Sequence, residues 1–156
     1  MTAGAEADPP TQLISYAQNG EDVVLWRALG HITEGNYVDV GAAHPIVDSV
    51  TKVFYENGWS GIDVEPLPQY AEALAADRKR DLVVEAGAGE TEETVTFYGV
   101  PETGLSSLSE NVLEEAAARG FSATELRVLI RPLNDIVAQR FNPGDDIHFL
   151  KIDVEG

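Results

Sequence analysis

Short apolar runs alternate along the chain with segments in which apolar residues recur every three or four positions. The runs at residues 37–40, 59–65 and 82–86 are apolar with few interruptions, which predicts buried strands. Between them, residues 46–57 and 68–77 have the spacing of amphipathic helices. This β-α-β-α-β order predicts a parallel sheet with right-handed crossover connections.

The segments outside this unit extend the pattern in both directions. Residues 23–29 precede the first strand as an expected helix that Gly30 closes. At 94–98, alternation with a period of two predicts a half-exposed strand. The other expected elements are a polar loop at 104–108, a helix that Ser109 caps and that runs to Arg119 before Gly120, a β-like run at 126–130, a short helix at 134–141 and a last strong strand at 147–152.

Length and composition bound the class of protein. The 156 residues are enough for one domain with a hydrophobic core, and 44% hydrophobic with 24% charged residues is typical of a soluble globular protein. The formal net charge of -17 argues against a basic face that binds nucleic acid or an anionic membrane. The chain has no cysteine, which excludes disulfides, thiolate metal sites and a cysteine nucleophile.

The first residues differ in composition from the rest. Residues 1–12 are rich in Ala, Glu, Pro and Thr and lack the basic and apolar regions of a signal peptide. No run of 18 apolar residues occurs elsewhere. We therefore expect a flexible leader at 1–12, one domain at 13–156 and a cytoplasmic location.

The turn after the first strand is the most informative stretch. A dinucleotide fold needs G-x-G-x-x-G, but here Ala43 and Ile46 follow Gly41 in the second and third places, and no P-loop Lys-Ser/Thr follows. The remaining D-x-G pattern suits S-adenosylmethionine (SAM), which has no phosphates and needs a carboxylate and carbonyl oxygens. Asp39, Gly41 and Ala42 are thus candidate cofactor-binding residues, although Asp39 is also compatible with simple capping of the next helix.

Two further positions extend this candidate cofactor site. Glu65 ends the second expected strand, 24 positions after Gly41, and an acid about 20 residues after such a turn accepts the ribose hydroxyls in nucleotide sites. Ala88 lies in the loop expected at 87–89, where small residues leave room for the flat adenine ring. The alternatives are a surface acid before a proline turn and an ordinary glycine turn.

Candidate catalytic residues follow the last strand and the first. Asp153 and Glu155 follow strand 147–152. A carboxylate at this position could accept a proton from a substrate hydroxyl or hold a cation. The alternative is that both are acids in a frayed chain end without a function. His44 lies in the glycine turn and is a candidate to border the reacting groups. His31, His44 and His148 lack metal-ligand spacing, so we expect no metal, and His148 should lie at the opposite end of the sheet.

Several motifs occur in an order typical of one family. They are SYAQNGED at 15–22, VDVGA at 38–42, TKVFY at 51–55, GWSGIDVEP at 58–66, GLSS at 104–107, LNDI at 133–136 and FLKIDVEG at 149–156. From residue 14 to 156 the chain resembles the FkbM family of SAM-dependent methyltransferases. His44 stands where that family usually has Asn or Asp.

The resemblance implies a Rossmann-like class I methyltransferase fold, an α/β sheet with helices on both faces in which strand 147–152 lies beside 37–40. It also implies O-methylation of hydroxyls on sugars or polyketide-type natural products. By the same resemblance, Asp39 and Gly41 contact the methionine part of SAM and Glu65 contacts the ribose. Asp153 would lie near the transferred methyl group.

Family members continue past the final motif, so we expect the C-terminal strands of the sheet to be missing from this chain. An open sheet edge favours self-association, and we expect it to weaken catalysis. Three functions remain open: a SAM-dependent O-methyltransferase with a small-molecule or glycan hydroxyl acceptor, a non-catalytic nucleotide-binding fragment or interaction module, and an NAD-linked oxidoreductase. The missing glycines disfavour the last.

Overall fold

The computed structural model describes residues 12–100, 105–107 and 111–154. Its centre is a parallel four-stranded sheet in the order β3-β2-β1-β8. The apolar runs predicted the parallel sheet but not this order. Its strands, in chain order, are β1 (Asn36–Val40), β2 (Ser60–Val64), β3 (Leu82–Val84) and β8 (Phe149–Ile152). The last strand lies beside β1, which confirms the position implied by the family resemblance.

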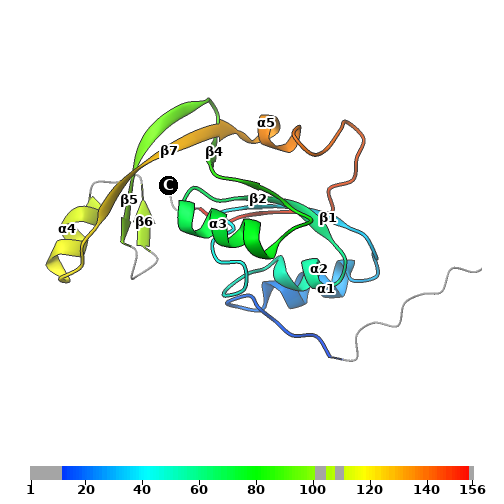
Figure 1. Ribbon diagram of the computed structural model, residues 1–156. Helices are drawn as coiled ribbons and strands as arrows, with labels where there is room; N and C mark the ends of the chain where they lie inside the picture. The colour runs from blue at the N-terminus through cyan, green and yellow to red at the C-terminus, as the bar shows by residue number, and fades with distance from the viewer. Residues whose placement is uncertain (1–11, 101–104, 108–110, 155–156) are drawn as a thin grey trace, which may run out of the picture.

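Helices cover both faces of this sheet (Figure 1). On one face, Val38 and Val40 pack with Ile136 of α5 (Leu133–Val137). On the other face, Tyr37 packs with Phe54 and with apolar side chains of α1 (Glu21–Leu29). The side chains of β1 alternate between the two clusters because successive residues of a strand point to opposite faces. The α/β architecture with helices on both faces is therefore confirmed.

A second sheet extends from the first in Figure 1, in the order β4-β7-β5-β6. Its strands are β4 (Gly87–Gly89), β5 (Glu93–Val100), β6 (Leu105–Ser107) and β7 (Thr124–Pro132), and α4 (Asn111–Ala118) packs against it. The pairs β5·β7 and β5·β6 are antiparallel, whereas β4·β7 is parallel. The change of pattern after the third strand in the sequence thus marks a change of sheet.

The helix expected at 46–57 is much shorter than predicted. Only α2 (Lys52–Glu56) is helical, and the preceding residues form turns in which Ala43 and Asp48 have φ of 53° and 57°. Such left-handed backbone interrupts a helix. The carbonyl oxygen of Pro45 accepts a hydrogen bond from the Arg78 guanidinium, 2.8 Å away, instead of from a helical N–H.

The prediction of a loop at 87–89 is also wrong, because Gly87–Gly89 is strand β4. A Cβ atom would lie 2.6 Å from Ile130 Cδ1 at Gly87 and 2.5 Å from Ile130 Cγ2 at Gly89. The glycines therefore serve the close packing of Ile130 of β7. Likewise, residues 105–107 of the loop expected at 104–108 form β6, and its other residues lie outside the described ones.

Element boundaries differ in smaller ways. The strand at 82–86 ends at Val84, the helix at 134–141 is replaced by α5, and the strand at 147–152 starts at Phe149, whereas β5 and β7 are longer than the runs at 94–98 and 126–130. Helix α3 (Pro68–Asp77) has the predicted bounds, and α1 starts at Glu21 rather than at residue 23. The cap proposed at Ser109 lies outside the described residues. No helix in the described part of the chain is long and apolar enough to cross a membrane.

Candidate functional site

The carboxyl ends of β1, β2 and β8 meet at one edge of the parallel sheet, which is where such sheets bind ligands. Gly41 follows β1, and its N–H donates to the carbonyl of Val64 at 2.9 Å. On the other side, Asp153 follows β8, and its N–H donates to the carbonyl of Val40 at 3.0 Å. The turn is therefore joined to both neighbouring strands, with Glu65 at the end of β2.

Gly41 is required by the backbone itself. Its φ is 76°, and a Cβ atom would lie 2.1 Å from the carbonyl oxygen of Asp153. The space that a side chain would fill is thus taken by the segment after β8. The next residue but one, Ala43, is also left-handed, so the turn holds two unusual conformations close together.

Asp39 lies beneath this turn and is 1% exposed. The Thr51 hydroxyl donates to Asp39 Oδ2 at 3.0 Å, and the Lys151 ammonium lies 3.0 Å from Asp39 Oδ1. Oδ2 is therefore hydrogen-bonded and Oδ1 is ion-paired within the protein. In this arrangement Asp39 links the strand below the turn to Thr51 and Lys151.

Lys151 is a site residue that the sequence reasoning did not select. It pairs directly with Asp39 across β8 and β1, and its ammonium donates to the Gly41 carbonyl at 2.7 Å. Its Nζ also lies 3.9 Å from Asp153 Oδ2. The sequence did contain a signal, since charged residues stand within two otherwise apolar strands, and such charges are normally paired when buried.

Glu65 has a mostly satisfied carboxylate. It is 3% exposed, and its two oxygens accept hydrogen bonds from the N–H groups of Ala43 and Leu67, each at 2.8 Å. Burial raises the pKa of the Glu65 carboxyl, although these N–H groups and the charge of Lys151 lower it. Each carboxylate oxygen has a further lone pair, so both can still accept from a diol.

His44 is half-buried in the turn. Its Nδ1 accepts from the N–H groups of Ile46 and Val47 at 3.1 Å and 3.0 Å, and its ring meets Tyr70 edge-on at 6.4 Å. With Nδ1 occupied as an acceptor, the neutral ring carries its proton on Nε2. This tautomer is a hydrogen-bond donor toward a ligand and does not accept a proton at Nε2.

Asp153 has an exposed carboxylate, with 79% of its side chain accessible. Of the other predicted site residues, Ala42 is buried, with its N–H donating to Val64 O, and Ala88 packs against the core cluster of β1 and β2. Glu155 lies outside the described residues. The edge thus brings together Gly41, Ala42, Glu65 and Asp153.

His31 and His148 lie elsewhere. His31 is exposed after α1, and His148 exchanges hydrogen bonds with Asn36 at the amino end of β1, as predicted. His148 borders a shallow depression of about 720 Å³ that is lined mainly by polar side chains. No group of His, Cys, Asp and Glu suited to a metal ion occurs within residues 12–100, 105–107 and 111–154.

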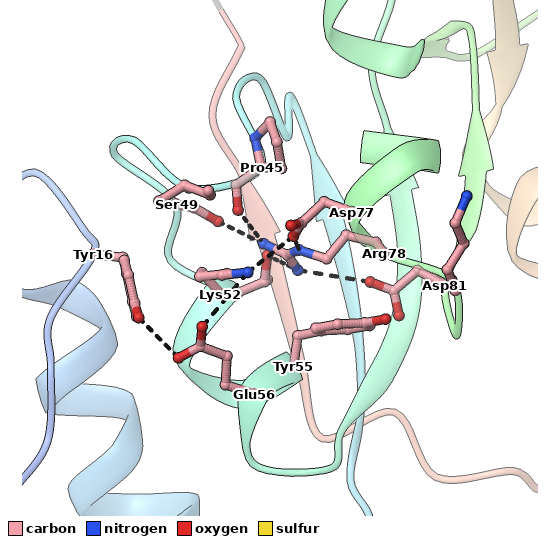
Figure 2. Close-up of polar contacts among 12 residues, drawn as sticks. Tyr16, Pro45, Ser49, Lys52, Tyr55, Glu56, Asp77, Arg78 and Asp81 are labelled. Atoms are coloured by element: carbon pink, nitrogen blue, oxygen red, sulfur yellow. Dashed lines mark hydrogen bonds and ion pairs between the residues drawn. The ribbon is translucent and has the colours of Figure 1, made fainter. Parts of the chain in front are cut away.

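Arg78 holds the back of the turn in place (Figure 2). Its guanidinium is buried, and it donates to the Pro45 carbonyl at 2.8 Å and to the Ser49 hydroxyl at 3.0 Å. It also donates to the Tyr37 hydroxyl at 3.1 Å and to Thr51 Oγ1 at 3.4 Å. Since Thr51 in turn donates to Asp39, one polar network runs from Arg78 to Lys151 and the Gly41 carbonyl.

Comparisons with known proteins give one family. The family model described as Methyltransferase FkbM domain matches residues 39–156, which includes the glycine turn, Glu65, Lys151 and Asp153. Comparison with curated proteins and with solved structures found no significant match. The matched segment covers most of the chain and contains the edge where the candidate residues meet. The chain therefore belongs to the FkbM methyltransferase family.

Proposed function

We propose that this chain is a SAM-dependent O-methyltransferase of the cytoplasm that acts on a hydroxyl of a sugar or polyketide-type natural product. Family membership supports the class of reaction, because a methyltransferase needs a methyl donor. The observation that carries the proposal is the convergence of the Gly41 turn, Glu65 and Asp153 at one sheet edge.

The residues at this edge fit SAM chemically. Glu65 is held by two N–H groups in a fixed orientation, with lone pairs left for the two ribose hydroxyls. Gly41 and Ala42 present backbone rather than bulk, and exposed Asp153 offers negative charge near the cationic end of SAM. When bound, SAM would supply an electrophilic methyl group on its sulfonium.

The chain's own contribution is positioning and proton transfer. The sheet edge would hold the acceptor against the cofactor site, and such positioning lowers the barrier of a transfer between two bound molecules. The Asp153 carboxylate, which is exposed, would accept the proton of the attacking hydroxyl. His44, with its proton on Nε2, would donate a hydrogen bond to an acceptor oxygen rather than remove its proton.

Calorimetric titration with SAM and S-adenosylhomocysteine, followed by transfer of labelled methyl to a panel of hydroxyl acceptors, tests this proposal. Binding of both ligands with labelled product supports it. Binding without transfer to any acceptor would instead favour a non-catalytic nucleotide-binding module. NADH binding in place of SAM would favour an oxidoreductase.

Removing the Glu65 carboxylate should weaken SAM binding. Glu65→Ala is expected to reduce the binding free energy of SAM by roughly 1–3 kcal/mol, because two ribose hydroxyls lose their acceptors. Free methionine, which has no ribose, should bind the variant as it binds the original. Glu72→Ala, an exposed acid on α3, is the matched control. Unchanged SAM affinity in folded Glu65→Ala would remove Glu65 from the site.

We also propose that the outer edge of β8 mediates self-association. Within the described residues β8 pairs only with β1, and Leu150 and Ile152 are 50% and 59% exposed. Unpaired strand edges beside apolar side chains favour pairing with a second copy. We expect the sedimentation coefficient to increase with protein concentration, and we expect Leu150→Lys to reduce this increase. Val24→Lys, at an exposed position on α1, should not. A monomer at all concentrations would contradict the proposal.

A further inference from the structure

The ammonium of Lys151, at the edge of the sheet where Gly41, Glu65 and Asp153 meet, has an N–H donor without an acceptor in the described structure. A lysine ammonium has three N–H donors. One donates to the Gly41 carbonyl at 2.7 Å, and the ammonium also forms an ion pair with Asp39 Oδ1 at 3.0 Å. Asp153 Oδ2 is 3.9 Å away, too far for a hydrogen bond. No acceptor for the third donor occurs in the described part of the chain.

The surroundings of Lys151 are acidic. Asp39, Glu65 and Asp153 all lie at this edge. The charge of Lys151 also reaches the start of α1. There, hydrogen bonds from the N–H of Glu21 itself and from Asn19 lower the pKa of the Glu21 carboxyl, and the charge of Lys151 lowers it further. Such an edge attracts cationic groups of a ligand and repels its anionic ones.

SAM carries both signs at its amino-acid end, where an ammonium and a carboxylate are attached to one carbon. The acids at the edge suit the ammonium and the sulfonium, but none of them can donate to the carboxylate while ionised. Lys151 is the cation in the described structure that contacts both Asp39 and the Gly41 turn. Its remaining N–H is therefore a positively charged donor suited to that carboxylate.

We propose that Lys151 binds the carboxylate of the amino-acid end of SAM, and that Asp39 is a positioning residue that holds the Lys151 side chain. This inference rests on the proposed function and assigns one ligand group within that site. A different role is that Lys151 only neutralises Asp39. The two roles differ in one measurable respect. If Lys151 binds the carboxylate, replacing Lys151 weakens only ligands that have a carboxylate; if it only neutralises Asp39, ligands with and without a carboxylate are affected equally.

Decarboxylated SAM, which keeps the ammonium, sulfonium, ribose and adenine, separates these roles. In Lys151→Met, we expect the Kd of SAM to rise roughly ten- to hundredfold, the range for a lost hydrogen bond to a charged group. The Kd of decarboxylated SAM should change less than about threefold. Lys79→Met, at an exposed lysine whose ammonium donates to the Ala75 carbonyl, should leave both values unchanged.

Lys151→Met leaves Asp39 buried without its cation, so the single variant is at risk of unfolding. The pair Asp39→Asn with Lys151→Met removes both charges and is measured in the same way, with circular dichroism as the test of folding. A selective loss of SAM affinity in either folded variant supports the proposal. An equal loss for both ligands, or no loss for either, overturns it.

The failure of this inference and of the proposed function give different results. If the original chain binds SAM and decarboxylated SAM but Lys151 shows no selectivity, the carboxylate assignment is wrong and the proposed function stands. If the original chain binds neither ligand, nor S-adenosylhomocysteine, the proposed function is wrong, and the assignment to Lys151 fails with it. Lys151→Arg, which keeps the charge, should retain most of the preference for SAM.

Discussion

Arg78→Met is expected to destabilise the folded chain by about 3–5 kcal/mol, the range for removing one partner from a buried charge cluster. The Arg78 side chain is fully buried, and its guanidinium lies between a loop carbonyl, hydroxyl groups and the acids Asp77 and Asp81 (Figure 2). The methionine would fill the volume of the alkyl part but remove the donor to the Pro45 carbonyl and the Ser49 hydroxyl and the cation beside Asp81.

The acids near Arg78 make this loss larger. Asp81 is buried and lies 3.6 Å from Arg78 Nη1. Burial raises the pKa of the Asp63 carboxyl well above its usual range, and the charges of Asp81 and Asp39 raise it further, whereas the charge of Arg78 lowers it. Without Arg78, the buried negative charge in this region has lost its main counterion.

Urea denaturation of Arg78→Met beside Arg27→Met, an exposed arginine of α1, measures this effect. We expect a large drop in the free energy of unfolding for the first variant and little change for the second. Arg78→Lys should also be destabilised, since one ammonium cannot reach Pro45, Ser49 and Tyr37 together. A change below about 0.5 kcal/mol in Arg78→Met would show that the cluster contributes little.

The parallel sheet was predictable because its strands are buried and therefore apolar almost throughout. In β1 and β2 the four residues after the first are all buried, so the runs stand out from the rest of the chain. The glycine turn and Glu65 could be placed for the same reason, since each directly follows such a run. The family motifs lie on these elements as well.

The misjudged segments depend on contacts that are distant in the sequence. Residues 46–51 have helical spacing, but Arg78 bonds the Pro45 carbonyl and the Ser49 hydroxyl from 33 and 29 positions away. Gly87 and Gly89 are typical of a turn in sequence, but in the structure a side chain at either position would collide with Ile130. No local pattern contains either partner.

The roles of the site acids were harder to predict than their positions. The family resemblance implied that the strands of Asp39 and Lys151 are neighbours, but not that these two residues are in register. Once they are paired, the Asp39 carboxylate is occupied by Thr51 and Lys151 and is buried. Of these acids, Asp153 rather than Asp39 has an exposed carboxylate.

Gly41→Val is expected both to destabilise the chain and to abolish SAM binding. A non-glycine residue in the left-handed region costs roughly 1–2 kcal/mol, and forcing a side chain into filled space costs about 1–3 kcal/mol more. At Gly41 the added Cβ would lie 2.1 Å from the Asp153 carbonyl oxygen and 3.3 Å from Val154 Cγ1. The segment after β8 must then move away from the turn, which weakens the hydrogen bonds from the Asp153 N–H to the Val40 carbonyl and from Lys151 to the Gly41 carbonyl.

Gly20 offers a matched control, because it has the same φ of 76° and a Cβ atom there would meet nothing within 4 Å. Gly20→Val measures the backbone penalty alone, so Gly41→Val should be less stable in urea by roughly a further 1–3 kcal/mol. Calorimetry on whatever fraction stays folded should show no heat of SAM binding for Gly41→Val. Equal stability of the two variants would mean that the chain at Asp153 moves aside at little cost in free energy. Unchanged SAM affinity in folded Gly41→Val would mean that the cofactor binds away from this turn.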